Sequence, residues 1–148
     1  MDIFSNTPES DQFLVKGSPS YMGNIHNLLT HRWVTNLPKT AESIRIGKPQ
    51  AKVDFSNSSQ QELEAFLRRI NMLTVACANA LLKRYNFSST KTLADVGCGG
   101  GGLALAIAKA YPQMQVTAID LPLVTSITKK IVEKEGATDR VNVMVVTC

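Results

Sequence analysis

A run of glycines within residues 97–102 is the part of the sequence whose residue types and spacing could do chemistry. Asp95 lies two residues before the first glycine, and Asp120 follows the next apolar segment. Glycines let a backbone turn tightly and approach a ligand, and a helix that begins behind them presents unpaired N–H groups. A carboxylate at the end of the following strand can accept hydrogen bonds from both hydroxyls of a ribose. The pattern therefore predicts a site for a ligand that contains a nucleoside.

Two ligand-binding patterns fit the glycine run. Gly97, Gly99 and Gly102 satisfy the GxGxxG pattern of dinucleotide sites. With Gly101 in place of Gly102, the run satisfies the GxGxG pattern of S-adenosylmethionine-dependent methyltransferases. Asp95 favours the second ligand, because the ammonium group of S-adenosylmethionine needs an anionic partner, whereas a pyrophosphate gains nothing from a nearby carboxylate.

Both acids also have a purely structural interpretation. Asp95 could cap the loop backbone, and Asp120 could be a solvated strand end before the turn at Pro122. Either acid alone would be weak evidence, so the prediction depends on the order of strand, glycine loop, helix, strand and acid.

The elements that must position these residues alternate between strand and helix patterns. Three apolar strand patterns separated by helical ones imply a right-handed, parallel βαβαβ unit. A short buried strand is expected over residues 92–96, and further strands over 115–119 and 141–147. The helices are expected over residues 103–111 and 122–135.

The composition changes near residue 88, because the preceding residues show helical patterns and turns with little that is typical of a buried strand. We therefore predict a helical linker or substrate-side region over residues 1–88 and the ligand-binding region over residues 89–148. In the first region we expect turns within residues 1–19, helices over 21–33 and 38–46, a loop over 48–59, and a long helix capped by Ser58 or Ser59.

Composition excludes several classes of protein. The chain has 148 residues with 44% hydrophobic and 19% charged residues, which is typical of a globular protein. The net charge of +4 is spread out with no basic cluster longer than a pair, which argues against a nucleic-acid partner. Residues 72–82 form the longest apolar-rich stretch and are too few to span a bilayer, so we expect no membrane partner.

The three cysteines form no paired motif. Cys77, Cys98 and Cys148 include no CxxC, so we predict neither a disulfide framework nor a metal site. This usage fits a reducing cytoplasm, and residues 1–20 lack the apolar segment of a signal peptide. We therefore expect a cytoplasmic protein.

Residues 93–102 and 119–122 (LADVGCGGGG and IDLP) resemble the cofactor motifs of the O-methyltransferase family that includes plant phenolic, hydroxyindole and bacterial antibiotic-tailoring enzymes. The upstream residues resemble the segment that joins the winged-helix dimerisation region of that family to its methyltransferase domain. The resemblance covers nearly the whole chain. The upstream signature consists of Asn6-Thr7-Pro8, Phe13-Leu14-Val15, Gly17-Ser18-Pro19, Trp33 and Gly47-Lys48-Pro49.

The resemblance implies an α/β fold in which an N-terminal helical segment precedes the first half of a Rossmann-like methyltransferase sheet. It also implies S-adenosyl-L-methionine as cofactor. Asp95 would bind the amino group of the cofactor, Asp120 the ribose hydroxyls, and Leu121 would pack near the adenine. The full set of implied cofactor-binding residues is Asp95, Gly97, Cys98, Gly99, Gly101, Asp120 and Leu121.

The chain departs from the family at two positions. Cys98 stands where the family often has a glycine, which is free of strain only if the φ of this residue is negative. We expect it to be a small buried residue rather than a reactive thiol. Arg69-Ile70 replaces an Ala-Met pair of the family on the long helix, which changes the neighbouring pocket wall.

The strand order of the family, 3-2-1-4-5, implies further strands that residues 1–148 do not supply. We therefore expect residues 92–96 to form a sheet edge and the general-base histidine to lie beyond Cys148, so no catalytic residue is assigned. His26 and His31 are interpreted as helix-surface residues. The 148-residue chain alone is expected to bind the cofactor weakly or not at all and to be inactive.

The resemblance implies methyl transfer from S-adenosylmethionine to a hydroxyl of a small, aromatic methyl acceptor, and homodimerisation. Two alternatives stay open. One is a nicotinamide-binding domain of an oxidoreductase, which would bind NAD and ignore S-adenosylhomocysteine. The other is a non-catalytic truncated protein that associates with a partner without turnover.

Overall fold

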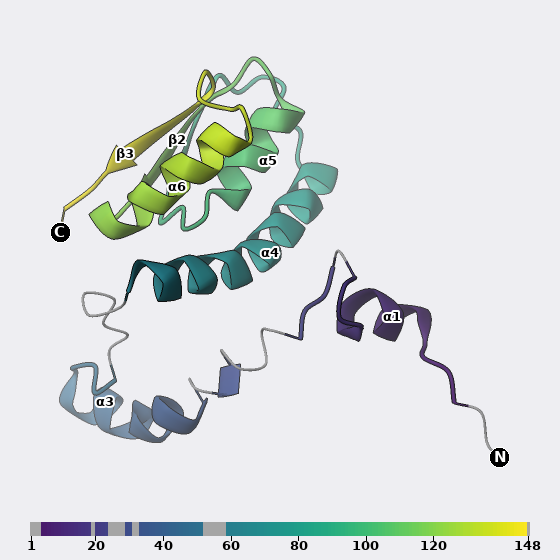
Figure 1. The fold of residues 1–148 in the computed structure, drawn as a ribbon. Coiled ribbons are helices and arrows are strands. Elements are labelled where there is room, and N and C mark those ends of the chain that lie inside the picture. The colour runs from purple at the N-terminus through teal and green to yellow at the C-terminus, as the bar shows by residue number, and fades with distance from the viewer. Residues whose placement is uncertain (1–3, 19, 24–28, 31–32, 52–58, 148) are drawn as a thin grey trace. The chain divides into compact units, whose positions relative to one another are not determined.

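A three-stranded parallel sheet forms the centre of the second half of the chain in the computed structural model, which describes residues 4–18, 20–23, 29–30, 33–51 and 59–147 (Figure 1). The strands are β1 (Thr92–Val96), β2 (Gln115–Asp120) and β3 (Val141–Val145), in the order β1-β2-β3. Ala94 pairs with Thr117, and Ala118 with Val143. The predicted α/β class with a parallel βαβαβ unit is confirmed.

Two helices connect the strands and cover one face of the sheet (Figure 1). These are α5 (Gly102–Ala110) and α6 (Pro122–Lys134). Each begins or ends within one residue of the predicted bounds, because Pro122 and Gly136 mark turns that the sequence already shows. The core between the helices and the sheet consists of buried Ala104, Ile107, Ala108, Met114, Val116, Ala118, Val132, Ala137 and Val141.

Strand β1 differs from its prediction in one respect. The apolar pattern of residues 92–96 predicts a buried strand, but the side chains along β1 are alternately exposed and half-buried. Val96 is 76% exposed. The reason is the position of β1 at the sheet edge, which was predicted, together with a sheet face that no described helix covers. The prediction of a buried strand was therefore wrong, whereas that of an edge strand is confirmed.

Helix α4 (Gln60–Arg84) begins at the predicted cap. The Ser59 hydroxyl accepts a hydrogen bond from the Glu62 amide, and the Glu62 carboxylate accepts one from the Ser59 amide. This reciprocal capping box satisfies two backbone donors at the start of the helix. Its buried side chains are Leu63, Leu67 and Ala78, and α4 runs alongside α5 (Figure 1).

By length and composition, α4 is also the one helix of the described residues that could cross a membrane. The sequence analysis missed this possibility because it considered only the apolar-rich residues 72–82, whereas the apolar character extends over more of the helix. In this structure α4 packs on α5, as a helix of a folded domain does.

The boundary between the two compact units of the chain lies just before α4. The chain separates into two units, Met1–Asn57 and Ser58–Cys148. The composition change near residue 88 therefore does not coincide with the boundary between the units, because α4 packs with the sheet that follows it. The functional assignment of residues 1–88 and 89–148 stays a prediction.

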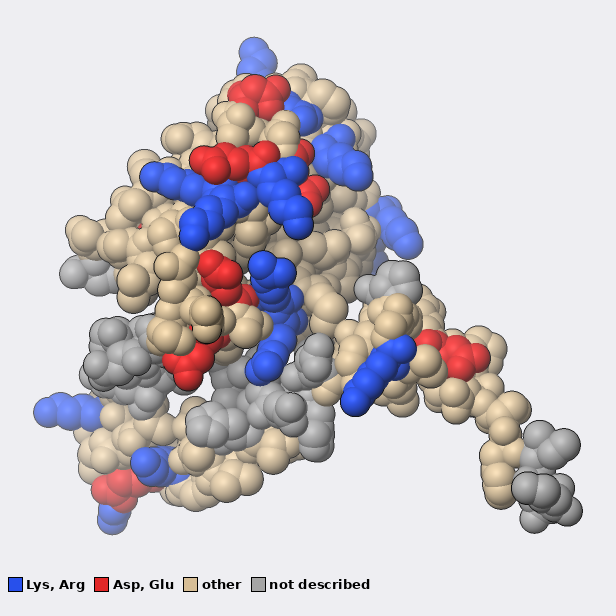
Figure 2. Space-filling model, viewed as in Figure 1, with Lys and Arg blue, Asp and Glu red and all other residues tan. Residues whose placement is uncertain are grey.

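The charges of the second unit are mixed in sign. Lys130 on α6 lies 3.9 Å from the Glu64 carboxylate on α4, measured from Nζ to Oε1. On the face shown in Figure 2, Lys and Arg side chains lie among Asp and Glu side chains.

The first unit contains helices α1 (Pro8–Leu14) and α3 (Thr40–Ile46), with a 3-10 turn at Leu37–Lys39 before α3. The sequence predicted turns where α1 lies, which was wrong. Thr7 caps α1 by accepting a hydrogen bond from the Ser10 amide, and Pro8 fits the first helical position. A threonine followed by proline was therefore a helix start rather than a turn.

The helix expected over residues 21–33 is confirmed only in part. Residues 21–23 are not helical, whereas residues 29–30 and 33–35 are. The intervening positions, with His26 and His31, lie outside the described residues, as does most of the loop predicted over 48–59.

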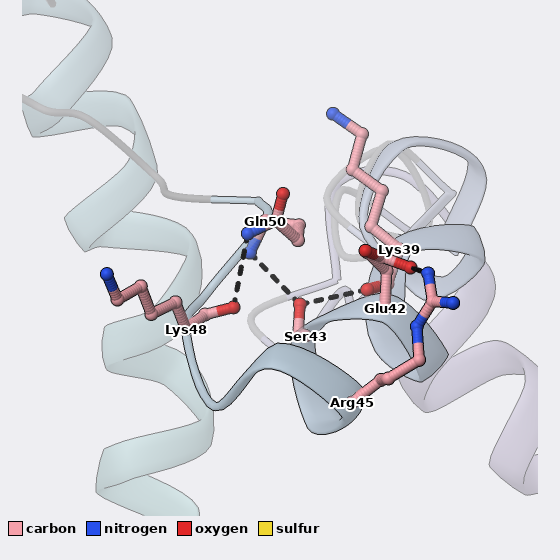
Figure 3. Close-up of polar contacts among 6 residues, drawn as sticks. All are labelled: Lys39, Glu42, Ser43, Arg45, Lys48 and Gln50. Atoms are coloured by element: carbon pink, nitrogen blue, oxygen red, sulfur yellow. Dashed lines mark hydrogen bonds and ion pairs between the residues drawn. The ribbon is translucent and has the colours of Figure 1, made fainter.

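Helix α3 matches the predicted helix over residues 38–46 and ends at Gly47, whose φ is 67°. Figure 3 shows how the chain turns back after it. The Ser43 hydroxyl donates to the Lys39 carbonyl at 2.8 Å and accepts from the Gln50 amide at 3.0 Å. Arg45 and Glu42 form an ion pair on the same helix. None of the described residues of this unit is buried.

Candidate cofactor-binding site

The glycine loop leaves β1 and is fastened to the end of β2. The amides of Gly97 and Cys98 both donate to the Ile119 carbonyl, at 2.8 and 3.0 Å. The Gly101 amide then donates to the Cys98 carbonyl at 2.8 Å, which closes a turn before α5 begins at Gly102. The loop and the residue that follows β2 therefore lie at the same edge of the sheet.

Three of the glycines are required by backbone conformation. Gly97, Gly99 and Gly101 have φ values of 79°, 53° and 75°. These values lie in the left-handed region, which costs other residues about 1–2 kcal/mol. Among the described residues no non-glycine has a positive φ, so Cys98 meets the condition that the sequence predicted for it.

The other two glycines are closely packed against a side chain, which the sequence analysis missed. Asn71 of α4 lies against them. A Cβ added to Gly102 would come within 2.4 Å of Asn71 Oδ1, and one added to Gly100 would come within 3.1 Å of the same atom. The Asn71 oxygen is buried and has no hydrogen-bond partner among the described residues. A polar residue within the apolar stripe of the long helix was the signal that could have identified this contact.

Asp120 lies where the sequence predicts it, at the end of β2 against the glycine loop. Its Oδ2 accepts a hydrogen bond from the Gly99 amide at 2.8 Å, and its Oδ1 accepts one from the Leu121 amide at 2.8 Å. A carboxylate oxygen can accept a second hydrogen bond, so both oxygens retain acceptor capacity. The Leu121 side chain is exposed beside it.

Asp95 is half-buried, and its Oδ2 accepts a hydrogen bond from the Ala104 amide at 3.3 Å. The structure therefore shows a capping contact, directed to the first turn of α5. Burial raises the pKa of Asp95, the bond from Ala104 opposes this effect, and the charge of Asp120 adds to it. A cation placed against this carboxylate would offset the cost of burying its charge.

Cys98 is buried in the loop, as expected for a small residue. Its Sγ lies 3.8 Å from the Gly99 carbonyl oxygen and 3.9 Å from the Thr128 hydroxyl. Burial raises the pKa of the Cys98 thiol to about 11, so the thiol is protonated at neutral pH and a poor nucleophile. Thr128, which the sequence analysis did not select, is the residue of α6 that contacts the loop.

A hollow of about 710 Å³ lies among α4, α5 and α6. It includes Asn71 and Gly102 but neither Asp95 nor Asp120. The acids therefore belong to an open edge of the sheet and not to this hollow. Among the residues that the structure describes, no three His, Cys, Asp or Glu side chains are grouped to hold a metal ion.

The chain resembles known O-methyltransferases in sequence. It is 22% identical to 3-hydroxy-5-methyl-1-naphthoate 3-O-methyltransferase of Streptomyces sahachiroi, over 94% of this chain and 41% of that protein. It is 27% identical to acetylserotonin O-methyltransferase of Gallus gallus, over 86% of this chain and 40% of that protein. The chain thus spans about two fifths of the length of these relatives.

Solved structures share the fold. An O-methyltransferase family protein from Burkholderia thailandensis superposes with a TM-score of 0.72 at 21% identity, over 96% of this chain and 43% of that one. Human N-acetylserotonin methyltransferase in complex with SAM gives a TM-score of 0.72 at 19% identity, over 96% and 43%. The model of the O-methyltransferase domain family matches residues 45–145, which is more than half of the chain. The chain therefore belongs to the O-methyltransferase domain family.

Proposed function

We propose that this chain supplies the cofactor-binding half of a methyltransferase that uses S-adenosyl-L-methionine and methylates a hydroxyl of a small aromatic molecule. The observation that carries the proposal is the contact between the Asp120 carboxylate and the Gly99 amide. It places a carboxylate beside a loop of left-handed glycines at the start of a helix. The relatives that act on a naphthoate and on acetylserotonin support the aromatic class of acceptor.

The residues present fit this cofactor. Asp120 Oδ1 and Oδ2 each accept one backbone hydrogen bond, and their remaining lone pairs would accept the two ribose hydroxyls. Gly97 has open space where a Cβ would stand, so the loop surface is accessible to the methionine portion. The exposed Leu121 would pack on the adenine, and the Asp95 carboxylate would attract the ammonium group.

When bound, S-adenosylmethionine supplies an electrophilic methyl carbon attached to a sulfonium. The chain's own residues would bind and orient this group. Asp120 would hold the ribose, the loop held by the Gly97 and Cys98 amides would support the methionine portion, and Asp95 would balance its positive charge. Alignment of this kind accounts for much of the rate enhancement of a two-substrate reaction. None of the described residues is assigned as the base that removes the hydroxyl proton.

The O-methyltransferase relatives favour S-adenosylmethionine over the nicotinamide alternative, because they place the glycine loop in a methyltransferase domain. Homodimerisation, a cytoplasmic location, and the absence of nucleic-acid and membrane partners stay predictions.

Calorimetric titration of S-adenosylhomocysteine into the purified chain tests the proposal, with NAD as the competing ligand and circular dichroism as the check on folding. Because the chain spans about two fifths of the length of its relatives, we expect weak but saturable binding of S-adenosylhomocysteine and none of NAD. The reverse preference would contradict the cofactor class. No binding by a well-folded chain would show that this chain alone does not form the site.

Substitution separates the role of Asp120 from general effects of charge. Asp120→Ala should weaken binding of S-adenosylhomocysteine by about tenfold or more, because both ribose contacts are lost. The matched control is Asp139→Ala, since Asp139 is exposed beside Arg140 and distant in sequence from the loop. An unchanged dissociation constant in Asp120→Ala would rule out the ribose role.

A further inference from the structure

The hydroxyl group of Thr128 in α6 makes a hydrogen bond outside its own helix. The residue is fully buried, and its Oγ1 lies 2.6 Å from the Gly99 carbonyl oxygen and 3.0 Å from the Val124 carbonyl oxygen. The single hydroxyl proton is donated over the shorter of these distances. The helix-internal contact to Val124 is usual for a threonine, whereas the contact to Gly99 crosses from α6 to the glycine loop.

Gly99 is consequently held at both of its polar groups. Its amide donates to Asp120 Oδ2 at 2.8 Å, and its carbonyl accepts from Thr128 at 2.6 Å. Gly99 has a left-handed φ of 53°, a conformation that glycine adopts without steric cost, and its carbonyl oxygen also lies 3.8 Å from Cys98 Sγ. The methyl group of Thr128 supports the same loop, since a Cβ at Gly101 would come within 3.2 Å of Thr128 Cγ2.

We propose that Thr128 is a positioning residue of the cofactor site, acting through Gly99 on the Asp120 carboxylate. The hydroxyl fixes the Gly99 carbonyl, and the Gly99 amide then fixes the rotation of the carboxylate that receives the ribose. The inference rests on the proposed function for its ligand. The link from Thr128 through Gly99 to Asp120 is a property of the chain without ligand.

Thr125 offers a matched control on the same helix. It is also buried, but its hydroxyl donates toward the backbone carbonyls at the start of α6, those of the N-cap residue Leu121 and of Pro122, at 3.2 and 3.0 Å. Thr128→Val and Thr125→Val each replace one buried hydroxyl by a methyl group. They differ in whether the lost bond reaches the glycine loop.

The first measurement is amide hydrogen exchange by NMR on the ligand-free chain. We expect the Gly99 amide to exchange about tenfold faster or more in Thr128→Val than in Thr125→Val. Thr128→Ser, which retains the hydroxyl, should restore slow exchange. The Val116 amide of β2, which donates to the Arg140 carbonyl just before β3, reports on global opening and should exchange equally in both valine variants. Equal Gly99 exchange in the two valine variants would overturn the proposal.

The second measurement is titration with S-adenosylhomocysteine. Thr128→Val should weaken binding about fivefold or more, whereas Thr125→Val should leave it unchanged. Adding Thr128→Val to Asp120→Ala should cause no further loss, because Thr128 acts through Asp120. Losses that multiply would contradict the route through Asp120. If the parent chain binds no S-adenosylhomocysteine, this chain alone does not form the site, while Gly99 exchange still decides whether Thr128 positions the loop.

Discussion

The two units of the chain stabilise their helices by different interactions. In the first unit the described contacts are short in sequence, such as the Thr7 cap on Ser10 and the pair of Glu42 with Arg45. In the second unit, side chains join distant segments: Thr128 reaches Gly99, and Arg140 donates to the Ala108 carbonyl at 2.8 Å. Local signals are thus sufficient to start and end a helix, whereas a positioned site needs contacts between elements.

The burial of apolar side chains also differs between the two units. Ile107 of α5 is 0% exposed, whereas Ile44 of α3 is 78% exposed. Each is an isoleucine on a helix, so residue type does not explain the difference. The first unit has no buried residue among those described, and its exposed apolar side chains contribute little hydrophobic stabilisation.

The largest expected effect on this contrast comes from shortening one isoleucine side chain in each unit. Ile107→Ala should lower the free energy of unfolding by about 2–5 kcal/mol, because it leaves a cavity in a closed core. Ile44→Ala should change it by no more than about 0.5 kcal/mol. Denaturant unfolding followed by circular dichroism measures both. A large loss from Ile44→Ala would show that this side chain is buried in solution and would remove the contrast.

A smaller difference is expected between two glycines at helix ends. Gly102→Ala should cost about 1–3 kcal/mol, because its Cβ would overlap Asn71. In Gly47→Ala the added methyl group meets no atom of the described residues within 4 Å, so the substitution should cost only the strain of the positive φ, about 1 kcal/mol.

The same unfolding measurement on a double variant identifies the cause. Asn71→Ala should recover most of the loss in Gly102→Ala, since the overlapping oxygen is removed. If the losses simply add, close approach of α4 is not the reason for the glycine at position 102.

The smallest expected effect concerns two carboxyl groups whose pKa values are shifted in opposite directions. Hydrogen bonds from its own backbone and from Thr7 lower the pKa of exposed Glu9, whereas burial raises the pKa of Asp95. Asp95 therefore favours folding below its unfolded pKa of about 3.9, and this contribution is lost as the pH rises through the folded pKa. The contribution of Glu9 has the opposite sign and is lost as the pH falls.

Asp95→Asn should consequently stabilise the chain more at pH 7 than at pH 3, relative to the parent. Unfolding at the two pH values measures this, and carbon NMR titration of the carboxyl groups gives the direction for each residue. An Asp95 pKa below that of Glu9 would contradict the assignment. A charge that weakens the fold at neutral pH is what a residue retained for ligand binding would show.

The sequence predicted those features that depend on neighbours along the chain. Gly97, Gly99 and Gly101 could be selected because left-handed turns need glycine, and Asp120 could be placed because parallel strands end at one edge. The cap of α4 could be narrowed to Ser58 or Ser59, and the structure has it at Ser59.

What the sequence did not reveal depends on residues far apart. Nothing near Thr128 indicates that its hydroxyl would reach a loop twenty-nine positions earlier. Asn71 looked like one polar residue in an apolar helix, since its contact with Gly102 exists only after α4 packs on α5. The exposure of Val96 likewise depends on the neighbours that β1 has in the sheet.

The order of the strands in the sheet is also their order in the chain. Each new strand pairs with the one made just before it, through a single connecting helix. The residues that pair are 23 positions apart for Thr92 with Gln115 and 25 positions apart for Val116 with Val141. During synthesis, β1 and the glycine loop leave the ribosome before β2, and β2 is the first strand with which β1 can pair. The loop could then be fastened to Ile119, and the Gly99–Asp120 contact formed, before β3 leaves the ribosome.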